Sequence, residues 1–206
     1  MTAQNVLTKV WRKPRWVMQN ISTESMPLSL MLLLIFFTGV STGLSQGSVR
    51  QLGGSIELSE KVINAFLFGG LGMLLLAPLY FVLLHFVCKR FFGGSGAFEY
   101  TRYAAVLAMV PSFFTVILGV LAILLFGDEA FTAETPVIND NFLLLAISAL
   151  IGLLQMILSI WSIFIFLTTL SEAHQFSRWK SFFSLITTAF IIAVPVIIVS
   201  VILRMI

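Results

Sequence analysis

The sequence predicts an all-α, polytopic integral membrane protein: a bundle of five transmembrane helices preceded by an interfacial amphipathic helix, with the N-terminus inside and the C-terminus outside. Of its 206 residues, 59% are hydrophobic and 10% are charged, whereas a soluble domain carries about 25% charged residues. Five apolar stretches are each long enough, at about 20 residues per span, to cross a hydrocarbon core. Lysine and arginine gather in the connections expected on one side of the membrane. A water-soluble fold is therefore excluded.

The apolar stretches divide the chain into a short leader and a transmembrane domain. We assign residues 1–26 to a cytoplasmic leader and residues 27–206 to a five-helix transmembrane domain. The single cysteine, Cys88, excludes an intramolecular disulfide. The predicted spans are residues 27–45, 62–88, 103–126, 142–170 and 182–203.

The distribution of basic residues predicts the orientation. Four of them precede the first span, and the connections after the second and fourth spans are also basic. By the positive-inside rule these segments are cytoplasmic, which places the N-terminus inside and the C-terminus outside. The connection after the third span is acidic, and we expect it to be a solvated exterior loop rather than a cation site. The basic residues are Lys9, Arg12, Lys13, Arg15, Lys89, Arg90, Arg102, Arg178 and Lys180 inside, against Arg50, Lys61 and Arg204 outside; the acidic loop holds Asp128, Glu129, Glu134 and Asp140.

The leader has the pattern of a helix that lies flat in the membrane interface. Its apolar residues recur at helical spacing and its basic residues cluster away from them. Pro14 interrupts the pattern, which predicts a kink or two short helices. An alternative is a docking site for a cytoplasmic partner. The residues expected at the membrane surface are Lys9, Trp11, Arg12, Lys13 and Trp16.

Small residues in the first two spans predict close helix contacts. Gly39 and Gly43 are four residues apart in the first span, and Ala65, Gly69 and Gly72 form a similar seam in the second. The first span resembles a cleavable signal in its basic flank, yet it lacks an A-x-A site, so we expect it to be retained.

The fourth span carries a polar stripe with helical spacing. Ser148, Gly152, Gln155, Ser159 and Ser162 fall on one helix face. One hypothesis is a packing seam with interhelical hydrogen bonds. The other is a polar groove for a lipid headgroup or a solute, with Gln155 at mid-membrane.

The sequence shows few residues suited to chemistry. His85 lies near the inner end of the second span, where we expect an interfacial residue rather than a proton relay. Pro78, Pro111 and Pro195 lie within spans and predict kinks. The chain contains no H-E-x-x-H, Walker or G-x-S-x-G motif. We therefore expect no catalytic residue, no metal site and no cofactor.

Several local motifs carry a family resemblance. Pro14 lies in a leader of tryptophan, proline and basic residues, and Gly93, Gly94, Gly96 and Phe98 form a glycine-rich loop. The loop leads into a span with the mid-span Pro111, and Trp161 lies in the fourth span. With five spans, this arrangement resembles the Yip1 family, in particular its bacterial members.

The resemblance implies a cytosolic N-terminal segment, five clustered spans and a short exterior C-terminus. Eukaryotic relatives act in early secretory trafficking and bind Rab-type GTPases, but their D-L-Y-G-P type motif is missing here, so that activity is not carried over. Some bacterial members occur beside ABC exporters.

The implied function is a non-enzymatic scaffold or accessory protein in the bacterial inner membrane. Membrane lipids and other membrane proteins, such as an ABC exporter, are the expected partners, and nucleic acid is not. The alternative is a small transporter or lipid-moving protein that uses the polar stripe of the fourth span as a path.

Overall fold

The computed structural model describes residues 2–22, 24–49, 57–132 and 135–205, and these are 87% helical with no strand among them. Arg50 and Glu134 lie outside the described residues. Five helical segments are long and apolar enough to cross a membrane, which confirms the predicted number of spans. In chain order the spans are α3 (Leu28–Val49); α4 (Leu58–Asn64), η1 (Ala65–Leu71) and α5 (Gly72–Phe92); α6 (Phe98–Leu107) and α7 (Val110–Phe126); α9 (Phe142–His174); and α10 (Arg178–Met205).

The leader forms two short helices, α1 (Ala3–Lys9) and α2 (Pro14–Asn20). Pro14 is the first residue of α2, a position where its missing N–H is not needed. The interfacial pattern had suggested that the apolar side of the leader is exposed to lipid, but it is not. Val6, Val10 and Val17 are buried in the protein's own core, because the leader folds against the ends of the spans.

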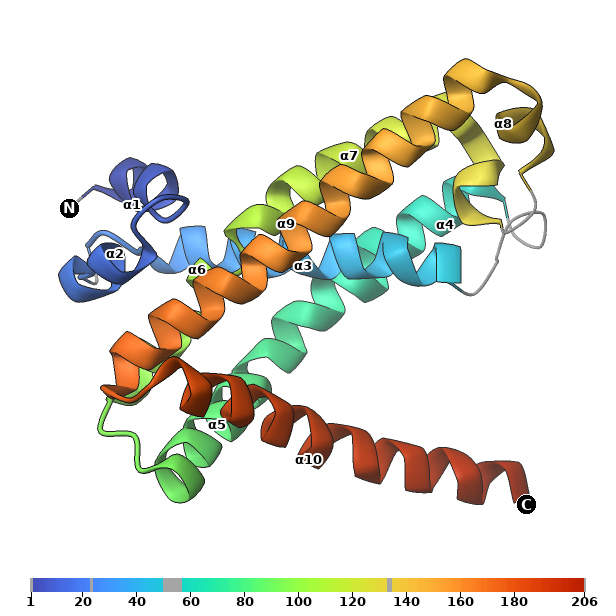
Figure 1. Cartoon of the computed structure of the whole chain (residues 1–206). Helices are drawn as coiled ribbons and strands as arrows, with labels where there is room; N and C mark the ends of the chain where they lie inside the picture. Colours follow the sequence, from blue (N-terminus) through green and yellow to red (C-terminus); the bar gives the residue numbers. More distant parts are fainter. Residues whose placement is uncertain (1, 23, 50–56, 133–134, 206) are drawn as a thin grey trace.

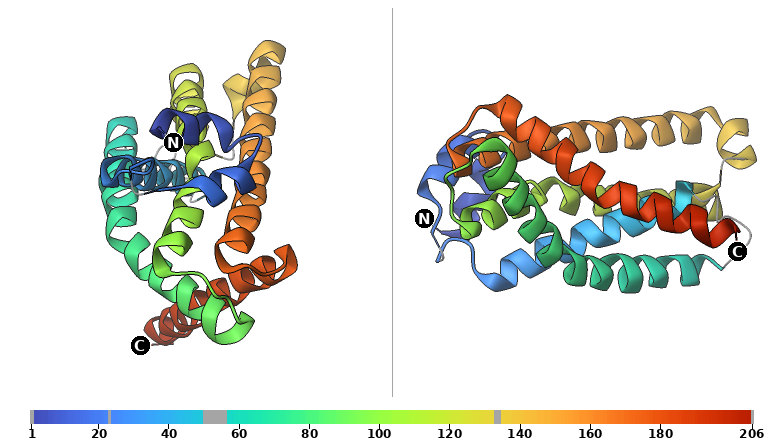
Figure 2. Two further views of the ribbon diagram at one scale, coloured as in Figure 1. Left: turned by 90° about the vertical axis from the view of Figure 1, so that its left-hand side faces the viewer. Right: turned by 90° about the horizontal axis from the view of Figure 1, so that it is seen from below.

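The two ends of the bundle differ in charge and in spread. One end, here called the basic end, holds α1, α2, the loop between α5 and α6, and the turn between α9 and α10 (Figures 1 and 2). The other, the acidic end, holds η2 (Gly127–Phe131), α8 (Pro136–Asp140) and the end of α10. The helices α9 and α10 diverge from their turn at the basic end (Figure 1).

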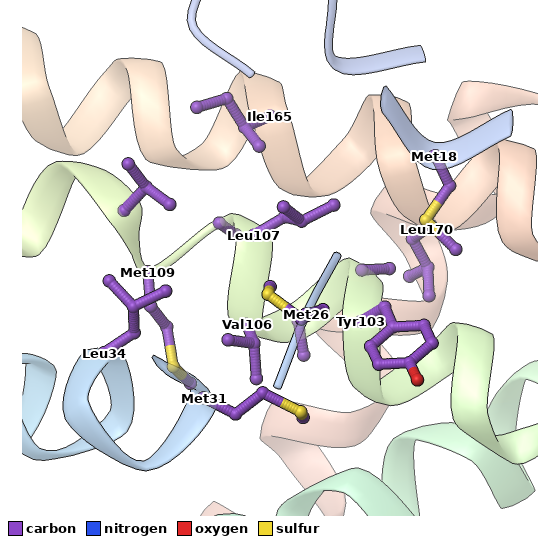
Figure 3. Packing of buried hydrophobic residues seen from close by; sticks show 14 of the residues in the cluster. Met18, Met26, Met31, Leu34, Tyr103, Val106, Leu107, Met109, Ile165 and Leu170 are labelled. Atoms are coloured by element: carbon purple, nitrogen blue, oxygen red, sulfur yellow. The ribbon is translucent and has the colours of Figure 1, made fainter. Parts of the chain in front are cut away.

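The main hydrophobic core lies toward the basic end, where the leader, α3, α6 and α9 meet (Figure 3). Residues 103–110 of α6 and the start of α7 are buried without interruption. Met26 precedes α3 and lies beside Val106 and Leu107 in this core (Figure 3). In contrast, only 6% of the most apolar window is buried in each of α9 and α10. Most side chains in these parts of α9 and α10 are therefore exposed at the surface of the chain.

Two spans depart from regular α-helix. The second contains the seven-residue π-helix η1, which the apolar pattern did not predict. The third breaks at Ala108 and Met109, just before Pro111 in the first turn of α7. The Ser162 hydroxyl of α9 donates to the carbonyl of Ala108 at this break. A neighbouring helix thus supplies a hydrogen bond to a carbonyl group that has no helical partner at the break. Pro78 and Pro195 lie inside α5 and α10.

Candidate functional site

The glycine-rich loop closes against the end of α9. Gly93 ends α5 with a φ of 69°, a left-handed conformation that suits glycine. A Cβ at Gly94 would overlap the His174 ring, and one at Gly96 would overlap the Ala173 carbonyl oxygen. Between them, the Ser95 N–H donates to the His174 carbonyl oxygen at 3.2 Å. The two glycines therefore allow the loop to approach α9 at backbone contact distance.

Three polar side chains from different spans meet beneath this loop. The Thr101 hydroxyl of α6 lies 2.8 Å from His85 Nδ1 on α5 and 2.9 Å from His174 Nε2 on α9. Thr101 is fully buried and His174 is 1% exposed. We call His85, Thr101 and His174 the histidine junction. It ties together the second, third and fourth spans.

The hydrogen-bonding capacity of the junction fits two neutral imidazoles. A hydroxyl has one proton and two lone pairs, so Thr101 can donate to one neutral ring while it accepts an N–H from the other. His174 Nδ1 is buried without a partner among the described residues. A neutral ring leaves only a lone pair unpaired there, whereas a protonated ring would bury a charge without a partner, which costs more. Phe176 stacks on His174 with ring centroids 5.3 Å apart, and Phe98 meets His85 edge-on at 5.6 Å. Aromatic rings thus shield the junction.

The sequence pattern predicted an interfacial residue at His85 and did not indicate its contact with Thr101 and His174. Both histidines lie near the basic end of their spans, so a comparison of all polar residues by depth would have paired them. Phe98, Gly94 and Gly96, which carried the family resemblance, all pack on this junction.

Polar contacts attach the leader to α9. Arg15 Nε donates to Glu172 Oε2 at 2.7 Å, and Gln19 Nε2 donates to Glu172 Oε1 at 2.7 Å. Trp11 meets Phe114 of α7 edge-on, with ring centroids 5.4 Å apart. Of the residues expected at the membrane surface, Lys9 lies over the ring of Trp16, while Arg12 and Lys13 are exposed.

The glycines of the first span lie against the second. A Cβ at Gly39 would overlap the Gly69 carbonyl oxygen, and one at Gly43 would come within 2.8 Å of the Ala65 Cα. At Gly72 a Cβ would meet nothing within 4 Å. The close approach of α3 is therefore to η1 and, at Met73, to the first turn of α5, while Gly72 itself is not part of the contact.

The polar stripe of the fourth span divides into three parts. Ser162 donates across to the α6–α7 break, as described above. Ser159 is exposed, and its hydroxyl donates to the Gln155 carbonyl of its own helix. The nearby Trp161, which is outside the stripe, is also exposed and contacts Phe164. The remaining members, Ser148, Gly152 and Gln155, line a cavity of about 300 Å³.

This cavity lies between α3, α7 and α9 on the side of the acidic end. Apart from the stripe, its polar lining includes Ser41 and Ser45 of α3 and Thr115 of α7. A Cβ at Gly152 would meet nothing within 4 Å, so the glycine borders open space. The stripe thus lines a partly polar cavity that extends along α9 to Gln155.

The acidic loop is more structured than a solvated loop. Lys61 Nζ, whose side chain is 1% exposed, lies 2.6 Å from Asp128 Oδ1. The Glu129 carboxylate accepts hydrogen bonds from the backbone N–H groups of Val137 and Ile138 in α8, at 2.9 and 3.0 Å. Asp128 and Glu129 thus hold η2 against α4 and α8, while the Asp128 side chain remains 58% exposed.

The fold and these contacts define a polytopic helical membrane protein of five spans, tied together at one end. A family model described as the Yip1 domain matches residues 8–201, nearly the whole chain, and the chain therefore belongs to the Yip1 family. Comparison with curated proteins and with solved structures found no match.

Proposed function

We propose that this Yip1-family protein is a non-enzymatic scaffold or accessory protein of a bacterial plasma membrane, where it supports a transport or trafficking complex such as an ABC exporter. The observation that carries the proposal is the unequal packing of the spans. Their basic ends are locked together, whereas the outer parts of α9 and α10 present apolar faces to their surroundings. A fixed base with exposed spans suits a protein that acts through contacts within the membrane.

The polar groups at the basic end support this role over catalysis. The imidazole of His174 is enclosed by the glycine-rich loop and Phe176, and its Nε2 is engaged by Thr101. A catalytic acid or base needs access to its substrate. The junction therefore suits a structural tie between spans.

The test is co-purification of the exporter subunits with variants of one exposed helix face. Val196 in α10 and Leu79 in α5 are similarly exposed, at 63% and 68%. If α10 holds the partner, Val196→Trp reduces the recovered exporter at least fivefold, while Leu79→Trp leaves it unchanged. Quantitative mass spectrometry after mild-detergent purification gives the result. Recovery no better than with an unrelated five-span protein would reject the scaffold.

The proposed orientation has its own test. Reporters fused after Lys13, Gly94 and Trp179 are expected to report the cytoplasm, and one fused after Thr132 the exterior, on the basis of the basic residues. An exterior signal from Gly94 would reverse the orientation.

The cavity beside Gln155 favours a second candidate, a small transporter or lipid-moving protein. Its polar lining and its reach along α9 are what a solute or headgroup path requires. In a Cys88→Ser background, a path predicts that Gly152→Cys reacts with a water-soluble thiol reagent as fast as the loop control Ser177→Cys. Ser159→Cys, which is outside the cavity lining, serves as the lipid-facing control. Slow labelling of both α9 positions would favour the scaffold.

A further inference from the structure

We propose that the basic end holds a specific site for an anionic glycerophospholipid, with the headgroup phosphate between α2 and the start of α10 and one acyl chain along the groove between α7 and α9. The site is separate from the cavity beside Gln155 and does not depend on the scaffold proposal.

The headgroup part is a hollow of about 360 Å³ with a strongly basic lining. Arg12, Lys13 and Arg15 reach it from the leader and Arg178 from the first residue of α10. Arg15 is paired with Glu172, which lines an adjoining hollow of about 320 Å³. Among the described residues, no carboxylate lies within ion-pair distance of Arg12, Lys13 or Arg178. The hollow thus has an excess of positive charge.

A buried hydroxyl without a partner lines both hollows. Thr168 is 3% exposed, and its Oγ1 has no hydrogen-bond partner among the described residues. Neighbouring hydroxyls behave differently: Thr169 donates to the Ile165 carbonyl, and Ser171 donates to the Thr168 carbonyl. An unpaired buried hydroxyl is costly. A phosphate oxygen in the hollow would supply the acceptor that Thr168 lacks.

The acyl-chain part is an apolar groove farther along the same face of α9. It has a volume of about 480 Å³ and is lined by Trp11, Phe114, Ile117, Leu118, Leu154, Ile157 and Leu158. Phe164 and Thr168 of the basic hollow continue the helical spacing of Leu154, Ile157 and Leu158. At 1.5 Å per residue, Leu158 and Phe164 are separated by about 9 Å along the axis.

The succession of a basic hollow and an apolar groove selects the ligand. A free phosphate would use the hollow alone, whereas a phospholipid uses both parts in the order in which its headgroup and chain are joined. Basic pockets between membrane helices on the cytoplasmic side are suited to anionic headgroups. The two leader residues Trp11 and Arg12 bridge the parts, so the lipid would also hold the leader against α9 and α7.

The test compares lipid binding by the full chain in detergent. Native mass spectrometry measures retention of phosphatidylglycerol and of phosphatidylcholine with the same acyl chains. We expect preferential retention of phosphatidylglycerol by the wild type. In Arg12→Gln/Arg178→Gln its affinity is expected to fall roughly 30-fold, at about 1 kcal/mol for each basic residue. The charge-matched control, Lys89→Gln/Arg90→Gln at the same end, keeps it. Equal retention of the two lipids, or equal losses in the two double variants, would overturn the proposal.

Two further measurements are needed. The first distinguishes a bound phospholipid from free phosphate, and the second tests whether Thr168 contacts the ligand or only contributes to the fold. If inorganic phosphate raises the melting temperature as much as phosphatidylglycerol does, the occupant is free phosphate and the lipid site is rejected. Thr168→Val removes the unpaired hydroxyl, so the lipid-free variant is expected to melt no lower than the wild type. The rise in melting temperature with phosphatidylglycerol is expected to shrink. An undiminished rise would remove Thr168 from the site.

Discussion

The basic and acidic ends of this bundle are held together in different ways. At the basic end the leader, the glycine-rich loop and the end of α9 meet through backbone contacts, a buried three-residue network and a continuous apolar core. At the acidic end α10 lies apart from the other helices. There η2 is held by the ion pair of Asp128 with Lys61 and by hydrogen bonds from the first N–H groups of α8 to the Glu129 carboxylate. The comparison shows that membrane spans need not pack along their whole length. Tight contacts at the basic end and the close approach of α3 to η1 position five helices, although α10 extends away from the others.

The largest expected effect comes from breaking the backbone contact at the basic end. In Gly96→Ala the new methyl group would overlap the Ala173 carbonyl oxygen. Because this is a backbone atom of α9, it cannot move aside as a flexible side chain could. We expect a loss of about 3 kcal/mol in stability, at the upper end for overpacking. Gly152→Ala, on the cavity side, meets nothing within 4 Å and is expected to be neutral or slightly stabilising. Thermal unfolding in detergent measures both. Equal losses would show that the two ends are packed alike.

The next effect tests the ion pair of the acidic end. Asp128→Asn leaves the buried Lys61 ammonium without its partner, whereas Lys61→Met leaves a carboxylate that is already 58% exposed. We expect Asp128→Asn to cost about 2 kcal/mol, less than for a fully buried pair, and Lys61→Met to cost less. Thermal unfolding ranks the two variants. The reverse order would mean that the lysine acts through its packing on Phe131.

A smaller effect is expected at the histidine junction. Thr101→Val keeps the shape of the side chain but removes the hydroxyl that joins His85 and His174. The loss is expected to be about 1.5 kcal/mol, because the ring nitrogens of the buried His174 and the half-buried His85 lose their partner. Thr101→Ser, which restores the hydroxyl, is the control in the same unfolding assay. A valine variant as stable as the serine variant would exclude the junction as a tie between spans.

The smallest effect concerns the attachment of the leader. The Arg15 side chain is 66% exposed and the Glu172 side chain 12% exposed, so solvent reaches their ion pair from the arginine side. A double-mutant cycle with Arg15→Gln and Glu172→Gln is expected to give a coupling of about 0.5 kcal/mol. A coupling several times larger would place this contact among the main ties of the basic end.

The sequence was a good guide to features that depend on local pattern. Five apolar stretches predicted five spans, and Pro14 predicted two short leader helices. The π-helix Ala65–Leu71 was not predictable, because its apolar and glycine residues also suit regular helix. Pro111 predicted a kink, but the break lies before it, at Ala108 and Met109.

Features that join distant segments were harder to predict. Lys61 and Asp128 are 67 residues apart, and His85 and His174 lie on different spans. Helical spacing placed Ser148 and Gln155 on one face but could not show that the face borders a cavity, since that depends on where α3 and α7 lie. The family motifs identified the right loop without revealing that it encloses His174.

The length of α9 has a consequence for how the protein sits in a bilayer. Its 33 residues span about 50 Å, whereas the hydrocarbon core is about 30 Å thick. A helix this long must tilt or extend beyond the core, and the charged Glu172 and the leader contacts at its basic end favour extension there. The adjacent third span is similar in length, at 34 residues, but it breaks at Ala108 and Met109, whereas α9 is one continuous helix. We therefore expect the tilt of α9, and with it the spread of the exposed helices, to vary with the thickness of the host membrane.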